Sequence, residues 1–438
     1  MSDAGPADCW LGLDIGTSGC RAVAIGRRGE PMAEARIPLP EPEMPSSGAV
    51  EQDPEVWWTA VLEVLGALNR ELRGLVPRAL CLDGTSASLL LAAQDGRPLT
   101  PALMYNDTRS GDQARALERR VPADSPARGP GASLAKLLHL AGRLRGYGAP
   151  VLALHQADWI GGRLRGRFGD SDWNNGLKLG YDPRQLAWPA WLSALDLGPV
   201  QLPRCHRPGT DLGPIDVSVA AETGLPRSLR VHAGTTDSTA ATLAAGASVP
   251  GDAVSCLGST LVMKVVSTVP ISDARSGVYS HRVGDRWLVG GASNTGGAVL
   301  RQYFDNSELA RLSMRIDPAV QTGLDYYPLP RPGERFPTAD PQLPARLAPR
   351  PSDDALFLAG LFEGMARIER DAYRRLCALG APEPKRILTT GGGAPNRQWS
   401  GIRSRIIGLP IETARHQEAA YGAALLARGS RGRCQRNA

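Results

Sequence analysis

Residues 10–26 read WLGLDIGTSGCRAVAIG, and the fold and chemistry of the chain are best approached from this stretch. A short apolar run delivers Asp14 into a glycine-flanked turn that carries Thr17 and Ser18, and a second apolar run follows at once. The carboxylate suits a metal ion, the hydroxyls can donate hydrogen bonds, and backbone at glycine can approach phosphate oxygens closely. The stretch therefore predicts a nucleotide phosphate site, although a plain β-hairpin turn has similar composition.

The composition is that of an ordinary globular protein. The 438 residues are enough for two or three domains, and 42% of them are hydrophobic and 21% charged. The net charge of +6 is not gathered in a long basic run, apart from the last stretch RGSRGRCQRN, which we interpret as a solvated tail. We therefore expect no nucleic-acid partner, and the positive surplus suits an anionic ligand such as ATP.

The cysteines and the N-terminus indicate the compartment. No C-x-x-C pair or zinc-type cluster is present, no leader-like segment opens the chain, and no apolar run approaches 18 residues. We expect reduced thiols in a soluble, cytoplasmic protein without a membrane partner. The cysteines are Cys9, Cys20, Cys81, Cys205, Cys256, Cys377 and Cys434.

The pattern of the first turn returns in the second half. At residues 230–247, RVHAGTTDSTAATLAAGA, a short strand leads to Asp237 and then to a helix, so Asp237 is either a catalytic group or the N-cap of that helix. Gly258-Ser259-Thr260 then lies between two apolar strands and echoes the turn at Thr17. Two related turns in separate halves are typical of a duplicated fold that grips one nucleotide from both sides.

The remaining segments alternate between strand and helix and predict an α/β protein. An Arg-, Pro- and Gly-rich region, 111–220, is expected to elaborate the first domain, and a Pro-rich stretch, 327–351, lacks the periodicity of a core element. Two choices stay open: polar residues at 157–160 and 170–175 line a polyol pocket or form a polar loop, and Arg109 binds a ligand or pairs with Asp107. Predicted elements are strands at 10–40, 78–83, 287–292, 386–390 and 409–413, and helices at 54–68, 134–144, 354–379, 399–407 and 417–427.

The order and spacing of these motifs resemble the FGGY family of carbohydrate kinases, within the actin-like, hexokinase-like ATPase superfamily. The resemblance implies an α/β fold of two actin-like (ribonuclease H-like) ATPase domains with a nucleotide and sugar cleft between them. We expect a sugar-binding domain at 1–228, with 417–438 packing back on it, and an ATP-binding domain at 229–416. The matching motifs are Asp14-x-Gly16-Thr17 with Arg21, Tyr105-x-Asp107-x-Arg109, Gly234-x-x-Asp237, Gly258-Ser259-Thr260, Gly391-Gly392-Gly393 and the Ala-rich last helix.

The resemblance also implies roles for individual residues, with ATP and Mg²⁺ as the phosphate donor and its metal ion. Asp237 is expected to be the catalytic base, Asp14 to hold Mg²⁺, and both of them, together with Ser86, to bind the sugar. Because the two sites belong to different halves, closure about hinges at 224–230 and 408–417 is expected to exclude water. The expected ATP-binding residues are Thr17, Ser18, Gly258, Ser259, Thr260, Gly392, Gly393, Asn396 and Trp399.

The expected substrate follows from a departure from the commoner family pattern. Xylulokinases carry Met-His-Gly where this chain has Asp83-Gly84-Thr85-Ser86, and the chain resembles the compact D-ribulose kinases of cyanobacteria and plants, in which a serine matching Ser86 touches the sugar. We therefore expect phosphorylation of the terminal hydroxyl of D-ribulose, giving D-ribulose 5-phosphate, by a monomer or homodimer. The alternatives are a kinase for D-xylulose or another polyol, and a non-catalytic actin-like nucleotide-binding sensor; the chain has no P-loop motif.

Overall fold

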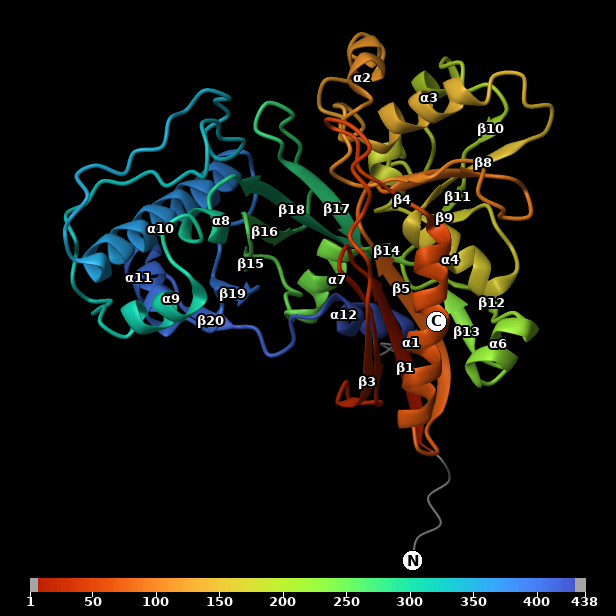
Figure 1. Ribbon diagram of the computed structural model, residues 1–438, viewed down its shortest axis with the longest axis horizontal. Coiled ribbons are helices and arrows are strands. Elements are labelled where there is room, and N and C mark those ends of the chain that lie inside the picture. Colours follow the sequence, from red (N-terminus) through yellow and green to blue (C-terminus); the bar gives the residue numbers. More distant parts are fainter. Residues whose placement is uncertain (1–6, 430–438) are drawn as a thin grey trace, which may run out of the picture. The chain divides into compact units, whose positions relative to one another are not determined.

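The structure, a computed structural model, describes residues 7–429, which form two compact α/β units (Figure 1). The first unit comprises the chain up to Ala244 and the segment from Glu418 onward, and the second is Ala245–Gln417. We expected the first domain to end at residue 228. Residues 229–244 instead belong to the first unit, because strands β13 (Arg230–His232) and β14 (Thr235–Thr236) both pair with its strand β5 (Val76–Gly84). Cys434 and the rest of the basic tail lie outside the described residues.

A seven-stranded mixed sheet forms the centre of the first unit. Its order is β12-β13-β5-β1-β2-β3, with β14 also pairing with β5. Strand β2 is antiparallel to both of its neighbours, β1 and β3. Strands β1, β13 and β14 run parallel to β5. The strands are β1 (Asp8–Ile15), β2 (Gly19–Ile25), β3 (Pro31–Pro38), β5 (Val76–Gly84), β12 (Asp211–Pro214), β13 (Arg230–His232) and β14 (Thr235–Thr236).

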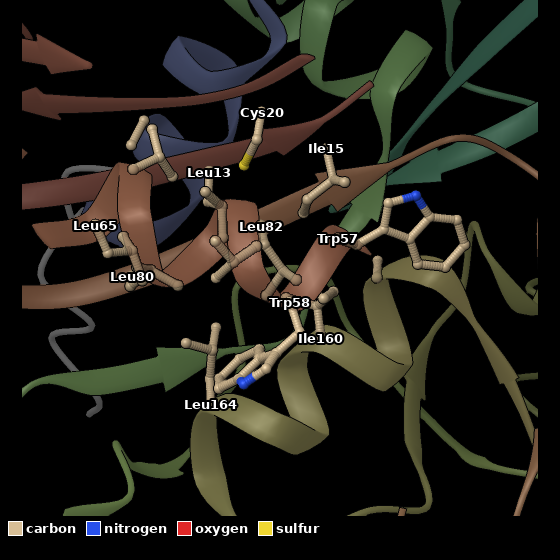
Figure 2. Packing of buried hydrophobic residues seen from close by; sticks show 14 of the residues in the cluster. Leu13, Ile15, Cys20, Trp57, Trp58, Leu65, Leu80, Leu82, Ile160 and Leu164 are labelled. Atoms are coloured by element: carbon tan, nitrogen blue, oxygen red, sulfur yellow. The ribbon is translucent and has the colours of Figure 1, made fainter. Parts of the chain in front are cut away.

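Two helices, α1 (Pro54–Glu71) and α4 (Gln156–Arg165), contribute to the hydrophobic core against one face of this sheet. Helix α1 begins as its sequence predicts, since the Asp53 side chain accepts a hydrogen bond from the backbone of Glu55 and Pro54 occupies the first turn. Figure 2 shows Trp57 and Trp58 among leucines and isoleucines of β1, β5 and α4. The stretch 157–160, expected to be a polar loop or pocket lining, is part of α4.

The last helix, α12 (Ala419–Arg428), packs on the sheet beside α7 (Asp237–Ala244). Its small residues allow an unusually close approach: a Cβ at Gly12 of β1 would clash with the carbonyl of Ala420, and one at Gly422 would clash with that of Ala240. Close packing by the Ala-rich helix, expected from its composition, is therefore present, and it fixes the strand that carries Asp14.

The outer part of the first unit holds smaller sheets and the remaining helices. Strands β6 and β8 are antiparallel and form the middle of a five-stranded sheet in the order β10-β8-β6-β7-β4, and β9 pairs with β11. The elements are β4 (Glu51–Gln52), β6 (Leu89–Ala92), β7 (Ala102–Leu103), α2 (Gly111–Leu117), α3 (Ser133–Arg143), β8 (Val151–His155), β9 (Asp170–Asp172), η1 (Gly176–Leu179), α5 (Ala190–Ser193), β10 (Val200–Gln201), β11 (Arg204–His206) and α6 (Val217–Thr223).

The second unit is a six-stranded sheet, β17-β18-β16-β15-β19-β20, with its own core. The stretch 327–351 was expected to lie outside the core, yet Phe336 is fully buried in it, and buried Glu334 accepts a hydrogen bond from the backbone of Asn294. The elements are β15 (Asp252–Leu257), β16 (Leu261–Ser267), β17 (Tyr279–Val283), β18 (Arg286–Ser293), α8 (Gly297–Leu300), α9 (Asn306–Ser313), α10 (Asp354–Ala378), β19 (Arg386–Thr390), α11 (Arg397–Ile407) and β20 (Ile411–Thr413).

The two units share one strand connectivity. In the first, β3-β2-β1 is antiparallel and β1-β5-β13 parallel; in the second, β18-β16-β15 is antiparallel and β15-β19-β20 parallel. In each unit a long helix, α1 or α10, precedes the parallel strand that adjoins the first one. This repetition agrees with the duplicated fold that the two small-residue turns predict. No helix within residues 7–429 combines the length and apolarity needed to span a membrane.

Candidate active site

Strand register groups three aspartates in the first unit. Asp14 of β1 lies opposite Asp83 of β5 in a parallel pair, and Thr235 of β14 lies opposite Asp83 on the other side. Asp237 follows two residues later as the first residue of α7. The carboxyl ends of neighbouring parallel strands form one edge, which is where ligands bind in open α/β sheets. The predicted groups Asp14 and Asp237 therefore lie in one unit, at one sheet edge, together with Asp83.

The protonation of this group is set by burial. Asp83 is fully buried and Asp14 is 8% exposed. Within the described residues no donor group hydrogen-bonds to either Asp83 oxygen, and the carboxyl lies close enough to that of Asp14 for the two to interact. Burial, followed by the charges of Asp14 and Asp237, raises the pKa of Asp83 well above its ordinary value, and burial raises the pKa of Asp14 as well. Burial therefore favours the protonated forms of both carboxyl groups.

The turn after β1 presents its hydroxyls as the sequence predicts. The backbone N–H of Gly16 donates to the carbonyl of Gly19 at 3.0 Å, which closes the turn, and leaves Thr17 half-buried and Ser18 exposed. Arg21 lies opposite Asp14 on β2 and forms an ion pair with Glu418 at the start of α12. The Arg21 charge favours the ionised form of Asp14, opposing the effect of burial.

Ser86 lies on a tight turn directly after β5. Every residue from Ala79 to Ala92 is buried except Ser86, which is half-buried at the tip of the turn. Asp83, three residues earlier, belongs to the aspartate group described above. The structure therefore places the three expected sugar-binding residues, Asp14, Ser86 and Asp237, in the first unit.

The fit of a magnesium ion can be judged from these carboxylates. Among residues 7–429 no group of three or more Asp, Glu, His or Cys side chains is arranged to hold a metal ion on its own. Magnesium is commonly held by one or two carboxylates, with water and substrate phosphates completing its octahedron. Asp14, with an unsatisfied buried carboxyl beside it, fits that incomplete protein site rather than a dedicated metal cage.

The second unit contains a cavity of about 810 Å³. Cavities of this size accommodate cofactor-sized ligands. Of the expected ATP-binding residues, Thr17 and Ser18 lie in the first unit and Thr260 lies outside the lining, whereas the other six line it. The lining residues are Leu257, Gly258, Ser259, Gly297, Leu300, Arg301, Asn306, Leu309, Ala310, Ser313, Phe362, Gly392, Gly393, Pro395, Asn396, Arg397, Gln398 and Trp399.

One wall of the cavity is built from glycine backbone and a capped helix. Gly391, with φ of 86°, has no room for a Cβ against Leu257, and a Cβ at Gly393 would lie 2.6 Å from the Trp399 ring. Gly392 differs, because nothing lies within 4 Å of a Cβ placed there. Asn396 caps α11 by accepting a hydrogen bond from the backbone of Trp399, whose ring stacks on Phe362 with centroids 4.8 Å apart. The backbone of this wall is therefore closely packed at Gly391 and Gly393, and only Gly392 leaves space next to it.

The lining also includes an arginine that was not predicted from the sequence. The backbone N–H of Gly297 donates to the carbonyl of Gly258, so the start of α8 lies against the Gly-Ser-Thr turn. Arg301 then donates from Nη2 to the Ser259 hydroxyl at 2.9 Å and lines the cavity. Guanidinium groups bind phosphate through paired N–H donors. An arginine after a glycine-rich helix start, four residues beyond Gly297, is the signal that could have identified it.

The structure also gives partners to the two sets of polar residues whose roles the sequence left open. Arg109 forms ion pairs with Asp107 and Glu51, each at 2.8 Å, so the structure favours the ion-pair interpretation. The Asp172 carboxylate accepts hydrogen bonds from the backbone of Asn174 and Asn175. Burial raises the pKa of Asp172 to about 7. Asn174 also donates from its side-chain amide to the Thr235 hydroxyl at 3.0 Å, so the 170–175 stretch is tied to the strand that lies beside Asp83.

Comparison with known proteins gives the family. The sequence matches the N-terminal domain of the FGGY family of carbohydrate kinases over residues 9–244 and the C-terminal domain over 253–428. The xylulose kinase of Escherichia coli strain K12 is 27% identical, covering 95% of this chain and 89% of that protein, and the one from Streptomyces coelicolor is 28% identical, covering 96% and 87%. The crystal structure of xylulose kinase from Rhodospirillum rubrum superimposes with a TM-score of 0.81 at 27% identity, covering 96% and 89%.

The matched domains span nearly the whole described chain: the N-terminal domain carries the sheet-edge aspartates, the C-terminal domain carries the glycine-walled cavity, and each has one small-residue turn. The chain therefore belongs to the FGGY family of carbohydrate kinases and is a phosphotransferase that acts on a sugar hydroxyl.

Proposed function

We propose that the protein transfers the γ-phosphoryl group of ATP to the terminal hydroxyl of D-ribulose, giving D-ribulose 5-phosphate. The observation that carries the proposal is the strand register that gathers Asp14, Asp83 and Asp237 at one sheet edge, just ahead of Ser86. In this proposal the first unit binds the sugar and the second binds the nucleotide in its 810 Å³ cavity. The transfer requires the two sites to face one another while the reaction proceeds.

The proposed chemistry needs only a weak base. Phosphoryl transfer passes through a loose transition state, so positioning and charge neutralisation do most of the work. Asp237 accepts the proton of the attacking hydroxyl through a carboxylate oxygen, and Asp14 orients the sugar at the same sheet edge. Mg²⁺, when bound, neutralises phosphate charge, and Asp14 is the residue that would hold it. The raised pKa of Asp83 favours its protonated form, which would limit the negative charge that the approaching phosphates meet.

The nucleotide contacts proposed for the second unit follow from its cavity walls. Gly392, Gly393, Asn396 and Trp399 form the side against which the adenosine packs. Gly258 and Ser259 offer backbone and hydroxyl donors to the phosphates, with Arg301 adding positive charge. Thr260 completes the same turn, and Thr17 and Ser18 supply the matching donors from the first unit. In this arrangement the adenosine and the phosphates of one nucleotide contact different residues.

The choice of D-ribulose rests on the turn at Ser86. A serine hydroxyl and a protonated carboxyl are short groups that can hydrogen-bond the sugar, whereas the commoner family pattern offers a histidine. A site built to bond one hydroxyl rejects a sugar that leaves its buried polar groups unpaired. D-xylulose is the second candidate, because the similar proteins found by comparison are xylulose kinases, although they are only 27–28% identical.

The test is a substrate panel in a coupled assay of ADP release. We expect the kcat/KM for D-ribulose to exceed the values for D-xylulose, L-ribulose, glycerol and erythritol under one set of conditions. Ser86→Ala is expected to raise the KM for D-ribulose roughly tenfold while leaving the KM for ATP within about twofold. A preference for another substrate would replace D-ribulose without changing the family, and ATP turnover that needs no sugar would favour the nucleotide-binding sensor.

A further inference from the structure

The turn that carries Ser86 has an unusual backbone. The backbone N–H of Ser88 donates to the carbonyl of Thr85 at 3.3 Å, and Ala87 has φ of 68°. A turn with positive φ at its third residue normally has glycine or asparagine there, because a Cβ is disfavoured in that conformation. Ala87 is buried and lacks a polar side chain that could stabilise the turn. The conformation that presents Ser86 must therefore be imposed by neighbouring groups.

One of these neighbours is the first residue of α4. The Gln156 side-chain oxygen accepts hydrogen bonds from the backbone and the hydroxyl of Thr85, both at 2.8 Å. The Thr85 hydroxyl also lies 2.6 Å from that of Ser88, and the backbone N–H of Gln156 donates to the carbonyl of Ser88. These bonds fix the two ends of the turn, but none of them reaches Ala87.

The strained centre of the turn is bonded by a buried lysine of α3. Lys136 is fully buried, and its Nζ donates to the carbonyl of Ala87 at 2.9 Å and to that of Met104 at 2.6 Å. Burial lowers the pKa of Lys136 to about 7, although the charge of Asp107 favours the ammonium form and that of Lys178 opposes it. Both the ammonium and the neutral amine have enough N–H donors for the two carbonyls.

We propose that Lys136 is a positioning residue for the sugar substrate: it holds the carbonyl of Ala87 and thereby fixes the turn that points the Ser86 hydroxyl at the sugar. The inference rests on the proposed sugar contact of Ser86. A buried amine is costly unless its donors are used, and here two donors are used on loop carbonyls rather than on an acidic partner. Lys136 itself touches neither the aspartate group nor the nucleotide cavity in the contacts described.

The experiment is a double-mutant cycle of Lys136→Met and Ser86→Ala, with kcat and KM measured for D-ribulose and for ATP. Lys136→Met keeps the volume and removes the donors, so we expect the D-ribulose KM to rise roughly tenfold with the ATP KM within about twofold. Adding Lys136→Met to Ser86→Ala should then cause little further change, because the hydroxyl that Lys136 positions is already absent. Lys385→Met, at an exposed lysine of the second unit, is the control and should match the parent protein.

A second variant keeps the test decisive if Lys136→Met does not fold. Lys136→Gln retains an N–H donor in the buried site. Its D-ribulose KM should be raised while its ATP KM stays unchanged. Where Lys136→Met also folds, the D-ribulose KM of Lys136→Gln should lie between those of the parent and of Lys136→Met. A folded Lys136 variant with an unchanged D-ribulose KM, beside a Ser86→Ala protein with a raised one, would overturn the inference and leave the proposed function standing. The inference would also be overturned if the rise in D-ribulose KM of the double variant equalled the product of the rises in the two single variants. If Ser86→Ala itself had no effect, the Ser86 contact and the inference would both fall.

Discussion

The two units use the same strand connectivity but place opposite chemistry at corresponding positions. In the first unit Asp14 lies opposite Asp83 across the parallel pair β1 and β5. In the second unit the same place, across β15 and β19, is taken by Cys256 and Thr390, which are not acidic. The small-residue turn that follows is exposed at Ser18 in one unit and at Ser259 in the other. One architecture therefore gives an acidic sheet edge and a neutral one.

If the first unit binds the sugar and the second binds the nucleotide, as proposed, this difference explains how a repeated fold serves both ligands. Carboxylates at the sheet edge suit a polyol and a metal ion, since both are bound by oxygen acceptors. The neutral edge leaves the glycine turn and Arg301 as the groups that a polyphosphate would meet, without acidic repulsion. Substitutions at the acidic edge of the first unit and at the neutral edge of the second should therefore have separate effects.

The largest effect is expected from removing Asp237, the proposed base at the acidic sheet edge. Asp237→Asn keeps the shape of the side chain and abolishes its basicity, so turnover of D-ribulose should fall by roughly 10²-fold or more. Nucleotide binding should be nearly unchanged, because the cavity lies in the other unit. Steady-state kinetics with a nucleotide titration measure both. Wild-type turnover in this variant would mean that Asp237 is not the base and has only a structural role at the start of α7.

A smaller effect is expected from making the neutral side acidic. Ser259→Asp puts a carboxylate beside the proposed phosphates, and like-charge repulsion should raise the KM for ATP at least roughly tenfold. Ser259→Asn, which has the same shape without the charge, is the matched control and should cause a much smaller change. If both variants behaved alike, the neutrality of this turn would not matter to the nucleotide.

The smallest effect concerns stability and pH on the acidic side. The raised pKa of Asp83 means that the folded protein holds a proton which the unfolded chain, with an ordinary pKa near 3.9, has already released. Stability should therefore fall as pH rises above that value, by about 1.4 kcal/mol per pH unit for one full proton. Asp83→Asn removes this proton uptake while still offering Asp14 a hydrogen-bond donor.

The measurement is the denaturation midpoint of both proteins between pH 5 and pH 8 without magnesium. The stability of the Asp83→Asn variant relative to the parent should increase toward pH 8, whereas Asp95→Asn, at an exposed turn, should follow the parent. A constant difference across the range would mean that Asp83 is ionised in the folded protein.

Local sequence was sufficient for the groups that sit on turns. Asp14 and Gly258 follow strong apolar segments, so their positions at strand ends could be predicted, whereas the helix cap at Asn396 became evident only in the structure. That Asp237 belongs to the first unit could not be predicted from local sequence. It depends on the pairing of β13 and β14 with β5, which lies more than a hundred residues earlier in the chain. Family resemblance alone gave the sugar role of Ser86.

The residues that were not predicted from the sequence lie in segments whose sequence is typical of the protein surface. Arg301 and the short helix α9 look like solvated segments after a glycine-rich turn, and only the tertiary structure places them on the cavity. Lys136 lies in an amphipathic helix, where a lysine is normally exposed, yet it is buried because two loop carbonyls converge on it. The core role of Phe336 is hidden by the prolines around it.

The division of labour between the units is tested most directly by calorimetric titration of D-ribulose and a non-hydrolysable ATP analogue into Ser86→Ala and Gly392→Val. Valine at Gly392 has room, since nothing lies within 4 Å of a Cβ there, whereas Gly393 is unsuitable because its Cβ would meet Trp399. The predicted result is selective: Ser86→Ala binds D-ribulose roughly tenfold more weakly and the analogue normally, and Gly392→Val does the reverse. A folded Gly392→Val protein that loses D-ribulose and keeps the analogue would contradict the assignment of sugar to the first unit and nucleotide to the second.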